Sequence, residues 1–254
     1  MIGIYFSGTG NTKYCINRFL EKLGENERSF PIEDKLAVNA VAEDNEIVFA
    51  YPVYYSNIPK IVRDFIEDNR TLWQGKRVFI IVTMGLFSGD GAGVSARLFK
   101  NFGAEISGGL HLKIPDCIGD VSLLKKPPAE NIKTIEQATR KIDNAAQHFR
   151  NGNPPREGLS VFHRIAGLFG QRLYFGPKVN GYAALPNIND EKCIGCGICE
   201  RLCPMENIKV RNGKALSRNR CTMCYRCFSE CPKQAITIIG KKVIVQYKFD
   251  DRTI

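Results

Sequence analysis

The chain has 254 residues, of which 44% are hydrophobic and 24% are charged, a composition typical of a globular protein with one or two domains. It has no run of about 18 apolar residues, which argues against a transmembrane segment, and its start lacks the features of a signal peptide. The formal net charge is +10, but the basic residues are scattered and follow no nucleic-acid recognition motif, which argues against nucleic acid binding. We therefore expect a cytoplasmic protein.

The first 150 residues alternate between strand and helix patterns. In chain order, we expect a strand over 2–6, a helix over 12–23, an edge strand over 29–32, a strand over 47–50, a helix over 58–66, a strand over 77–84, a helix over 92–102, a strand over 110–114 and a long helix over 131–149. The helical spacing is clear in the first helix, where Ile16, Phe19 and Leu20 share one face. This alternation predicts an α/β fold whose parallel sheet has helices on both faces.

The loop after the first expected strand is suited to a phosphate group. It reads Ser7-Gly8-Thr9-Gly10-Asn11-Thr12. Hydroxyls, glycines and free backbone N–H groups at the start of a helix are typical of a phosphate site, although a plain capped turn is the alternative. The loop is neither a Walker A motif nor a dinucleotide fingerprint, since Lys13 stands where the fingerprint needs glycine. Hydroxyl donors without a phosphate-binding lysine favour a monophosphate ester.

Two further loops follow expected strands at the sheet edge where ligands bind in such folds. The second loop has aromatic side chains that could flank a flat ring, and its candidate residues are Pro52, Tyr54, Tyr55, Ser56 and Asn57. The third has glycines that let backbone amides approach a ring edge, and its candidates are Gly85, Leu86, Phe87, Ser88 and Gly89. Ordinary packing is the alternative for the aromatic residues.

Residues 151–186 fit neither neighbouring pattern and are expected to form a linker. The segment begins with a helix terminator, Asn151 to Pro155. Residues 159–175 are apolar with Arg164 and Arg172, which predicts an amphipathic helix packed between the domains. An anchor on a membrane surface is the alternative.

Eight of the ten cysteines form two copies of the pattern C-x2-C-x2-C-x3-C-P, 28 positions apart. The first copy contains Cys193, Cys196, Cys199 and Cys203, and the second contains Cys221, Cys224, Cys227 and Cys231. Three cysteines at this spacing can hold three corners of an iron–sulfur cube, while the fourth turns away towards the other cluster. We therefore expect one 4Fe–4S cluster on Cys193, Cys196, Cys199 and Cys231, and another on Cys221, Cys224, Cys227 and Cys203.

Zinc and disulfides are the alternatives for these cysteines. Zinc sites usually pair two C-x2-C arms, and disulfides are rare in the cytoplasm, so neither explains the pattern as well. The two other cysteines, Cys15 and Cys117, are expected to be structural. No nucleophile–base pair stands out, and we assign no catalytic residue. A short strand is expected in the tail over 243–247.

Two resemblances follow from these motifs. Residues 187–240 resemble the bacterial two-cluster ferredoxins, and residues 7–12 resemble the phosphate loop of the flavodoxins, whose ring-binding loops the second and third loops match in position and character. Together the two parts resemble the flavodoxin–ferredoxin fusions of anaerobes known as the EFR1 family. The resemblance implies FMN and a doubly wound sheet of order 2-1-3-4-5 in residues 1–150, and a small α+β ferredoxin domain in residues 187–254.

The combination of cofactors predicts the function. A flavin exchanges one or two electrons and each cluster exchanges one, so we expect an electron carrier that relays electrons between FMN and the two clusters and serves other redox proteins. An FMN-dependent reductase of a quinone or a nicotinamide is the alternative, and a redox sensor is a weaker one. No motif specifies the partners or the oligomeric state.

Overall fold

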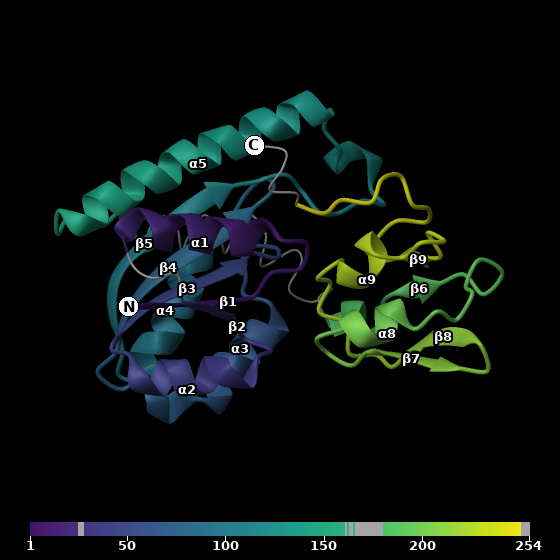
Figure 1. Cartoon of the computed structure of the whole chain (residues 1–254), viewed down its shortest axis with the longest axis horizontal. Coiled ribbons are helices and arrows are strands. Elements are labelled where there is room, and N and C mark those ends of the chain that lie inside the picture. Colours follow the sequence, from purple (N-terminus) through teal and green to yellow (C-terminus); the bar gives the residue numbers. More distant parts are fainter. Residues whose placement is uncertain (25–27, 161, 163–164, 166–179, 250–254) are drawn as a thin grey trace.

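The structure is a computed structural model of the chain, and it describes all residues except 25–27, 161, 163–164, 166–179 and 250–254. Figure 1 shows a larger N-terminal part, in which helices surround a sheet, beside a smaller C-terminal part with short strands. The tail of the chain returns from the smaller part towards the larger one. Among the residues described, no helix has both the length and the apolarity needed to cross a membrane.

The larger part contains a parallel sheet of five strands in the order β2-β1-β3-β4-β5. The strands are β1 (Ile2–Tyr5), β2 (Ser29–Pro31), β3 (Glu46–Pro52), β4 (Arg77–Met84) and β5 (Glu105–Lys113). The central strands are nearly continuous apolar runs because helices cover both of their faces, as parallel sheets require. The expected fold class and strand order are confirmed.

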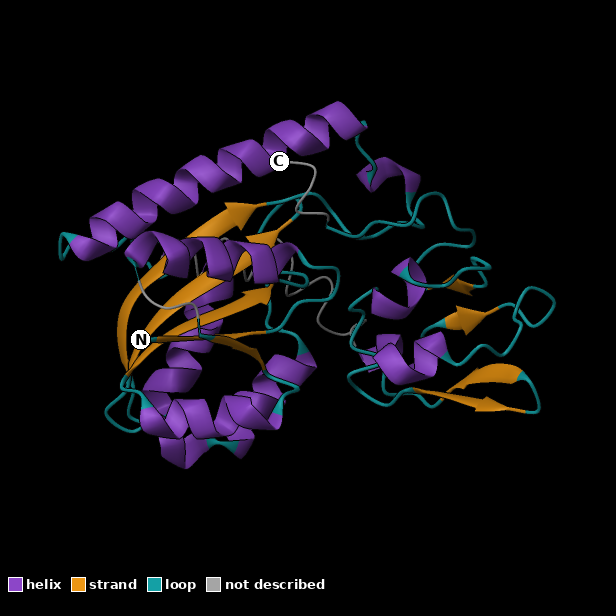
Figure 2. Ribbon diagram, viewed as in Figure 1, coloured by secondary structure: helices purple, strands orange, loops and turns teal. Residues whose placement is uncertain are grey.

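Helices form the outer layers on both faces of the sheet (Figure 2). They are α1 (Asn11–Leu23), α2 (Lys35–Glu43), α3 (Lys60–Asp68), α4 (Gly91–Asn101) and α5 (Pro128–Arg150). Helices α1 and α5 share one hydrophobic core with the sheet, and α2, α3 and α4 share another on the opposite face. Two short 3-10 helices, η1 (Arg70–Trp73) and η2 (Ser122–Leu124), lie in the connections.

Helix α2 was not predicted from the sequence. Its buried face consists of Ala37, Ala40 and Val41, which give only a weak helical pattern of apolar residues. The helix begins at an aspartate cap, because the side chain of Asp34 accepts a hydrogen bond from the backbone N–H of Leu36 at 2.9 Å. The capping residue was therefore the stronger signal in this segment.

The smaller part is built around the two cysteine groups. Its elements are η4 (Asn180–Ala184), β6 (Asn187–Ile188), α8 (Ile198–Leu202), β7 (Ile208–Arg211), β8 (Lys214–Ser217), α9 (Arg226–Ser229) and β9 (Ile236–Thr237). Strand β6 pairs with β9, and β7 pairs with β8, both antiparallel. Cysteines of both groups pack with Ile208, Phe228 and Ile236 in one small core.

The strand expected over 243–247 is absent, and this prediction was wrong. The tail instead crosses towards the larger part, where the backbone N–H groups of Ile244 and Val245 both donate to the carbonyl of Gly119 at 3.0 Å. Farther on, the ring of Phe249 stacks on Tyr14 with centroids 4.6 Å apart. The alternating apolar residues of the tail serve contacts with loops, so no strand ladder forms. The amphipathic helix expected over 159–175 lies largely outside the described residues.

Candidate functional site

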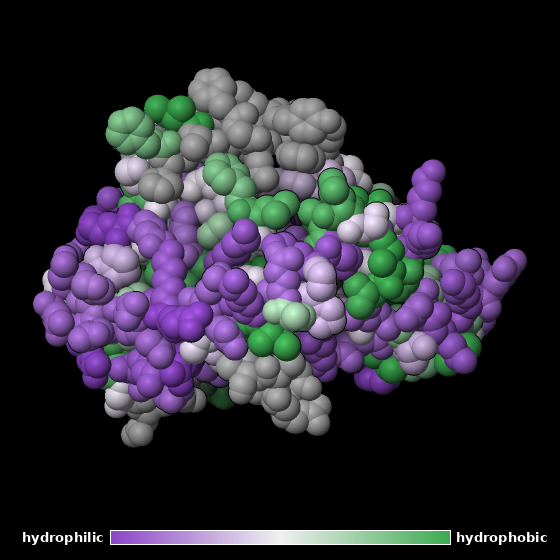
Figure 3. All heavy atoms as spheres, turned by 90° about the horizontal axis from the view of Figure 1, so that it is seen from above, coloured by the Kyte–Doolittle hydropathy of each residue, from purple (hydrophilic) through white to green (hydrophobic). Residues whose placement is uncertain are grey.

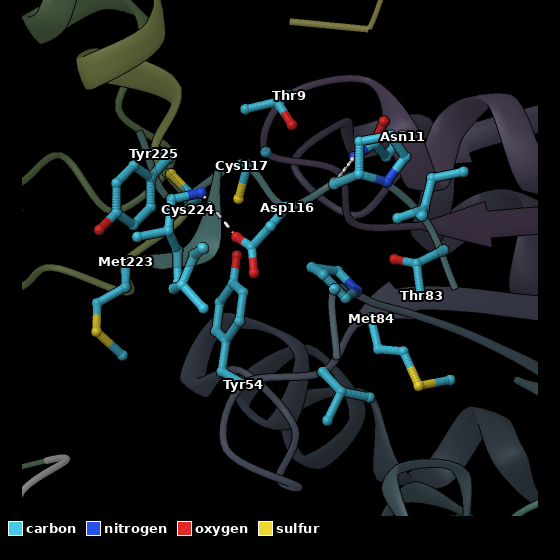
Figure 4. A pocket seen from close by; sticks show the side chains of 18 of the residues that line it. Thr9, Asn11, Tyr54, Thr83, Met84, Asp116, Cys117, Met223, Cys224 and Tyr225 are labelled. Carbon is cyan, nitrogen blue, oxygen red and sulfur yellow. Dashed lines mark hydrogen bonds between the residues drawn. The ribbon is translucent and has the colours of Figure 1, made fainter. Parts of the chain in front are cut away.

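A cavity of about 360 Å³ lies at the carboxyl ends of the sheet strands, between the two parts of the molecule (Figure 4). Its volume is in the range of sites that hold a cofactor or another small molecule. Leu86 and Phe87 line it and are 63% and 44% exposed, so the cavity reaches the surface there. Seen from above, apolar side chains gather over the middle of the molecule, whereas its two ends are hydrophilic (Figure 3).

Most of the loop residues predicted to bind a cofactor line this cavity. They are Ser7, Gly8, Thr9, Asn11, Thr12, Pro52, Tyr54, Tyr55, Gly85, Leu86 and Phe87. The three loops are far apart in the sequence, and the parallel sheet brings them together because each follows the carboxyl end of a strand.

Five of the predicted residues do not line the cavity, and the structure gives them other positions. They are Gly10, Ser56, Asn57, Ser88 and Gly89. Gly10 precedes α1 with a left-handed φ of 99°. Asn57 closes a tight turn, in which it exchanges two backbone hydrogen bonds of 3.0 Å with Tyr54. Ser88 is buried, with its hydroxyl 2.7 Å from Nδ1 of His111.

Hydrogen bonds fix the first loop at the start of α1. The backbone N–H of Gly10 donates to the hydroxyl of Ser7 at 3.2 Å, and the side-chain amide of Asn11 donates to the carbonyl of Pro115 at 2.9 Å. The hydroxyl of Thr12 lies 2.8 Å from that of Thr83 on β4. The first turn of a helix leaves backbone N–H groups without intrahelical acceptors, so this rigid loop can present them to an anion.

The tail adds to the same loop from outside. The hydroxyl of Tyr247 donates to the side-chain oxygen of Asn11 at 2.8 Å, and the backbone N–H of Phe249 donates to the carbonyl of Thr9 at 2.8 Å. A Cβ atom on Gly10 would lie 2.9 Å from Cβ of Phe249. These contacts were not predicted, because nothing in the sequence pattern of the tail indicates which loop it meets.

A fourth loop, which follows β5, was also missed. Residues 114–118 line the cavity together with Val53, Thr83, Met84, Val121 and Leu124. The rule that ligands bind at the carboxyl ends of strands would have pointed to this loop, because β5 ends at the same edge of the sheet. It supplies Asp116, the one carboxylate among the described residues that line the cavity.

Asp116 is held close to the third loop. A Cβ atom on Gly85 would lie 2.3 Å from its carboxylate oxygen Oδ2, so a larger residue there would have to displace the Asp116 side chain. The backbone N–H of Ile118 donates to its Oδ1 at 2.8 Å. Burial raises the pKa of Asp116 above the usual 3.8, and this effect outweighs the opposing effects of that hydrogen bond and of Lys125.

Replacing Asp116 with asparagine should therefore stabilise the protein increasingly as the pH rises. The folded state favours the neutral carboxyl, so its stabilising contribution is complete below the ordinary pKa of 3.8 and is lost as the pH rises through the raised value. The amide of Asp116→Asn does not ionise and keeps that contribution. Thermal unfolding of the apoprotein between about pH 4 and pH 7 would measure the difference. The exposed Asp68→Asn is the control, and a pH-independent difference would contradict the prediction.

The smaller part supplies one wall of the cavity. Met223, Cys224, Tyr225 and Ile239 line it beside the loops of the larger part (Figure 4). The two parts touch tightly there, because a Cβ atom on Gly8 would lie only 2.1 Å from the carbonyl oxygen of Cys224. Cys117, from the loop after β5, also lines the cavity, so one of the two cysteines that we expected to be structural lies at the site.

The cysteines of the first expected set surround a smaller cavity. Cys193, Cys196, Cys199 and Cys231 all line it, although Cys231 comes from the second copy of the motif. Burial raises the pKa of Cys199 to about 11, and the neighbouring charges of the other three add to this rise. The structure therefore places the fourth cysteine of the second copy beside the first copy.

Cys203 of the first copy lies near the cysteines of the second expected set, because it affects the pKa of Cys221, Cys224 and Cys227. Burial raises the pKa of Cys221 to about 12, with smaller effects from the nearby Cys224 and Cys203. Burial also raises the pKa of Cys227 well above its usual range, and the nearby Cys224, Cys221 and Cys203, with Cys199 of the first set, contribute. No three His, Cys, Asp or Glu side chains in the described part of the chain form a group that could hold a single metal ion.

Backbone N–H groups point at several of these sulfur atoms. Asn207 donates to Sγ of Cys203 at 3.2 Å, Met223 to Sγ of Cys221 at 3.3 Å, and Ala235 to Sγ of Cys231 at 3.3 Å. Such bonds favour the thiolate form, which is the form that binds iron. The donor set therefore suits iron–sulfur clusters.

Comparisons with known proteins find a known domain in each part of the chain. Residues 2–105 match the flavodoxin domain, and residues 192–236 match the 4Fe-4S dicluster domain. An uncharacterized ferredoxin of Methanocaldococcus jannaschii is 39% identical over 69 residues, which are 25% of this chain and 86% of that protein. NADH-quinone oxidoreductase subunit I 2 of Geobacter metallireducens is 29% identical over 87 residues, which are 30% of this chain and 66% of that subunit.

A further relative is matched over much less of its length. An uncharacterized protein of Methanocaldococcus jannaschii is 38% identical over 50 residues, and the chain spans only 19% of it. Among solved structures, the two-electron reduced flavodoxin of Megasphaera elsdenii is 23% identical with a TM-score of 0.43, over 57% of this chain and 98% of that one. A flavodoxin from the Archaea is 14% identical with a TM-score of 0.41, over 59% of this chain and 97% of that one.

Proposed function

The chain belongs to the 4Fe–4S dicluster ferredoxins through its C-terminal domain and carries a flavodoxin domain before it, and from this premise we propose that it relays electrons between FMN and two 4Fe–4S clusters. An electron-transfer role follows from the two domains. The flavodoxin domain implies FMN, and the dicluster domain implies iron–sulfur clusters. In this proposal the protein is a carrier between other redox proteins, and its two domains in this order also support membership of the EFR1 fusions.

One observation is the main support for the proposed electron relay. Cys224, an expected ligand of the second cluster, lines the same cavity as the three cofactor loops of the flavodoxin domain. The contact between Gly8 and the carbonyl of Cys224 leaves no room for a water layer between the domains at that point. Direct transfer between the two sites therefore needs no partner protein and no movement of the domains.

The described residues suit the proposed cofactors. The backbone N–H groups and hydroxyls of residues 7–12 would hold the phosphate of FMN, and aromatic side chains such as Tyr54, Tyr55 and Phe87 would exclude water from its ring. When bound, FMN exchanges one or two electrons and each cluster exchanges one, which links two-electron to one-electron chemistry. The two crossed sets of four cysteines would hold the clusters.

The proposed boundaries of the domains are residues 1–150 and 187–254, with a linker over 151–186. The C-terminal tail does not fit a simple division of the chain into two domains. It follows the ferredoxin domain in sequence, but its Tyr247 and Phe249 bond to the phosphate loop. We assign the tail a structural role in both domains.

The relay can be tested with the anaerobically purified chain. We expect about eight iron atoms and one FMN per chain. After partial reduction by a light-activated reductant, flavin and cluster absorbance should equilibrate at a rate that does not depend on protein concentration, since both sites are in one chain. A rate proportional to protein concentration would contradict the relay. Steady-state oxidation of NAD(P)H, or reduction of a quinone, by the holoprotein would instead favour the reductase.

A further inference from the structure

Arg226 is the basic residue within the second cysteine group, between Cys224 and Cys227. It begins α9, which lies on the side of the ferredoxin domain that faces the flavodoxin domain (Figure 1). Its side chain is only 23% exposed. A guanidinium group in such a position is expensive to bury unless its donors are satisfied, so its hydrogen bonds indicate what it does.

Those hydrogen bonds join both domains. One terminal nitrogen, Nη2, donates to the carbonyl of Ser7 in the phosphate loop at 2.9 Å and to the carboxylate of Glu33, after β2, at 2.6 Å. The other, Nη1, donates to the carbonyl of Leu202 at 3.3 Å. Leu202 precedes Cys203, the expected fourth ligand of the second cluster. Arg226 thus lies in one of the two segments that supply the second set of cysteines, and its side chain contacts the other segment and the phosphate loop.

The contact with Ser7 has a direct consequence for the phosphate loop. Ser7 begins the loop, and its hydroxyl accepts the backbone N–H of Gly10. A guanidinium that holds the Ser7 carbonyl also fixes the direction of the N–H groups that follow, which an anion would need. The mostly buried charge lies beside the phosphate loop and close to Cys224 of the second set, where it would stabilise negative charge on a phosphate or on a cluster.

We propose that Arg226 is a positioning residue that couples the FMN site to the second cluster. This inference rests on the proposed function. The planar fork of arginine can bond to several acceptors at once, which the single ammonium of lysine cannot reproduce. Arg226 holds the phosphate loop through Ser7, so its loss weakens FMN binding. Its positive charge favours the more negative, reduced form of the second cluster, so its loss lowers the reduction potential of that cluster.

Four single variants, one of them a control, distinguish the effects of Arg226 on FMN binding and on the cluster potential from the effect of its ion pair with Glu33. Arg226→Gln should weaken FMN binding about tenfold or more, the expected effect of losing a hydrogen bond from a charged donor, and should lower the potential of one cluster. Arg226→Lys keeps the charge but not the fork, so it should leave the potential near that of the native protein and still weaken FMN binding. Glu33→Gln removes only the ion-pair partner and should change FMN binding by less than either. Arg218→Gln, an exposed change in the same domain, is the control.

Two measurements are needed, both on the anaerobic full chain with its clusters. FMN binding to the flavin-depleted chain is followed by quenching of flavin fluorescence, and cluster potentials by redox titration with electron paramagnetic resonance. Native FMN affinity in Arg226→Gln, or an equal loss in Glu33→Gln, would overturn the proposal. Absence of intramolecular transfer in the native chain would refute the relay alone, because neither measurement here depends on transfer.

Discussion

Replacing Gly8 with alanine should push apart the phosphate loop and the loop that holds Cys224, and so impair both FMN binding and electron transfer to the second cluster. The new Cβ atom would lie 2.1 Å from the carbonyl oxygen of Cys224, which is backbone and cannot rotate away. Either the phosphate loop or the cluster loop must move, at a cost of about 1–3 kcal/mol by comparison with overpacked cores. We therefore expect FMN binding to weaken about ten- to hundredfold and intramolecular electron transfer to slow.

Gly181 provides a matched control for this change. A Cβ atom there meets no atom of the described residues within 4 Å, so Gly181→Ala adds the same methyl group without a collision among them. Flavin fluorescence titration and stopped-flow absorbance of both variants give the comparison. If Gly8→Ala bound FMN and transferred electrons like Gly181→Ala, the close contact between the domains would not matter for either process.

The fold was predictable from the sequence because its signals are local. Each central strand is a short apolar run between turn residues, and strand–helix alternation allows few arrangements other than a parallel sheet. Helix α2 was not predicted, because small residues such as Ala37 and Ala40 form its buried face and give a weak apolar pattern. The tail over 243–247 was misjudged for the opposite reason, since its alternation looks like a strand while its partner is the loop at Gly119.

The candidate site was predictable only in part, because it depends on contacts between distant segments. The loops at Ser7, Tyr54 and Gly85 could be found, since each has a local motif and follows a strand. The contribution of Met223 and Tyr225 to the cavity wall could not be predicted, because no sequence pattern indicates how two domains dock. Arg226 illustrates the limit, since an arginine between two cysteines gives no sign that it reaches Glu33 in another domain.

The crossed sets of cysteines predict opposite results for two single substitutions. Cys203 lies in the first copy of the motif but beside the second set, so Cys203→Ser should remove the cluster next to the flavin cavity. Cys231 lies in the second copy but lines the first small cavity, so Cys231→Ser should remove the distant cluster. Each variant should retain about four of eight iron atoms, because each loses one four-iron cluster.

Transfer kinetics distinguish the two variants where iron content does not. Fast exchange between flavin and cluster should disappear in Cys203→Ser and persist in Cys231→Ser, since only the second set borders the flavin cavity. Cys15→Ala is the control, because Cys15 is fully buried in the flavodoxin core, where burial raises the pKa of its thiol to about 12. The reverse pattern, with exchange lost in Cys231→Ser and kept in Cys203→Ser, would show that each copy of the motif binds its own cluster. In that case Cys224 would still line the flavin cavity and the contact between the domains would be unaffected, but the crossed assignment of Cys203 and Cys231 would be wrong.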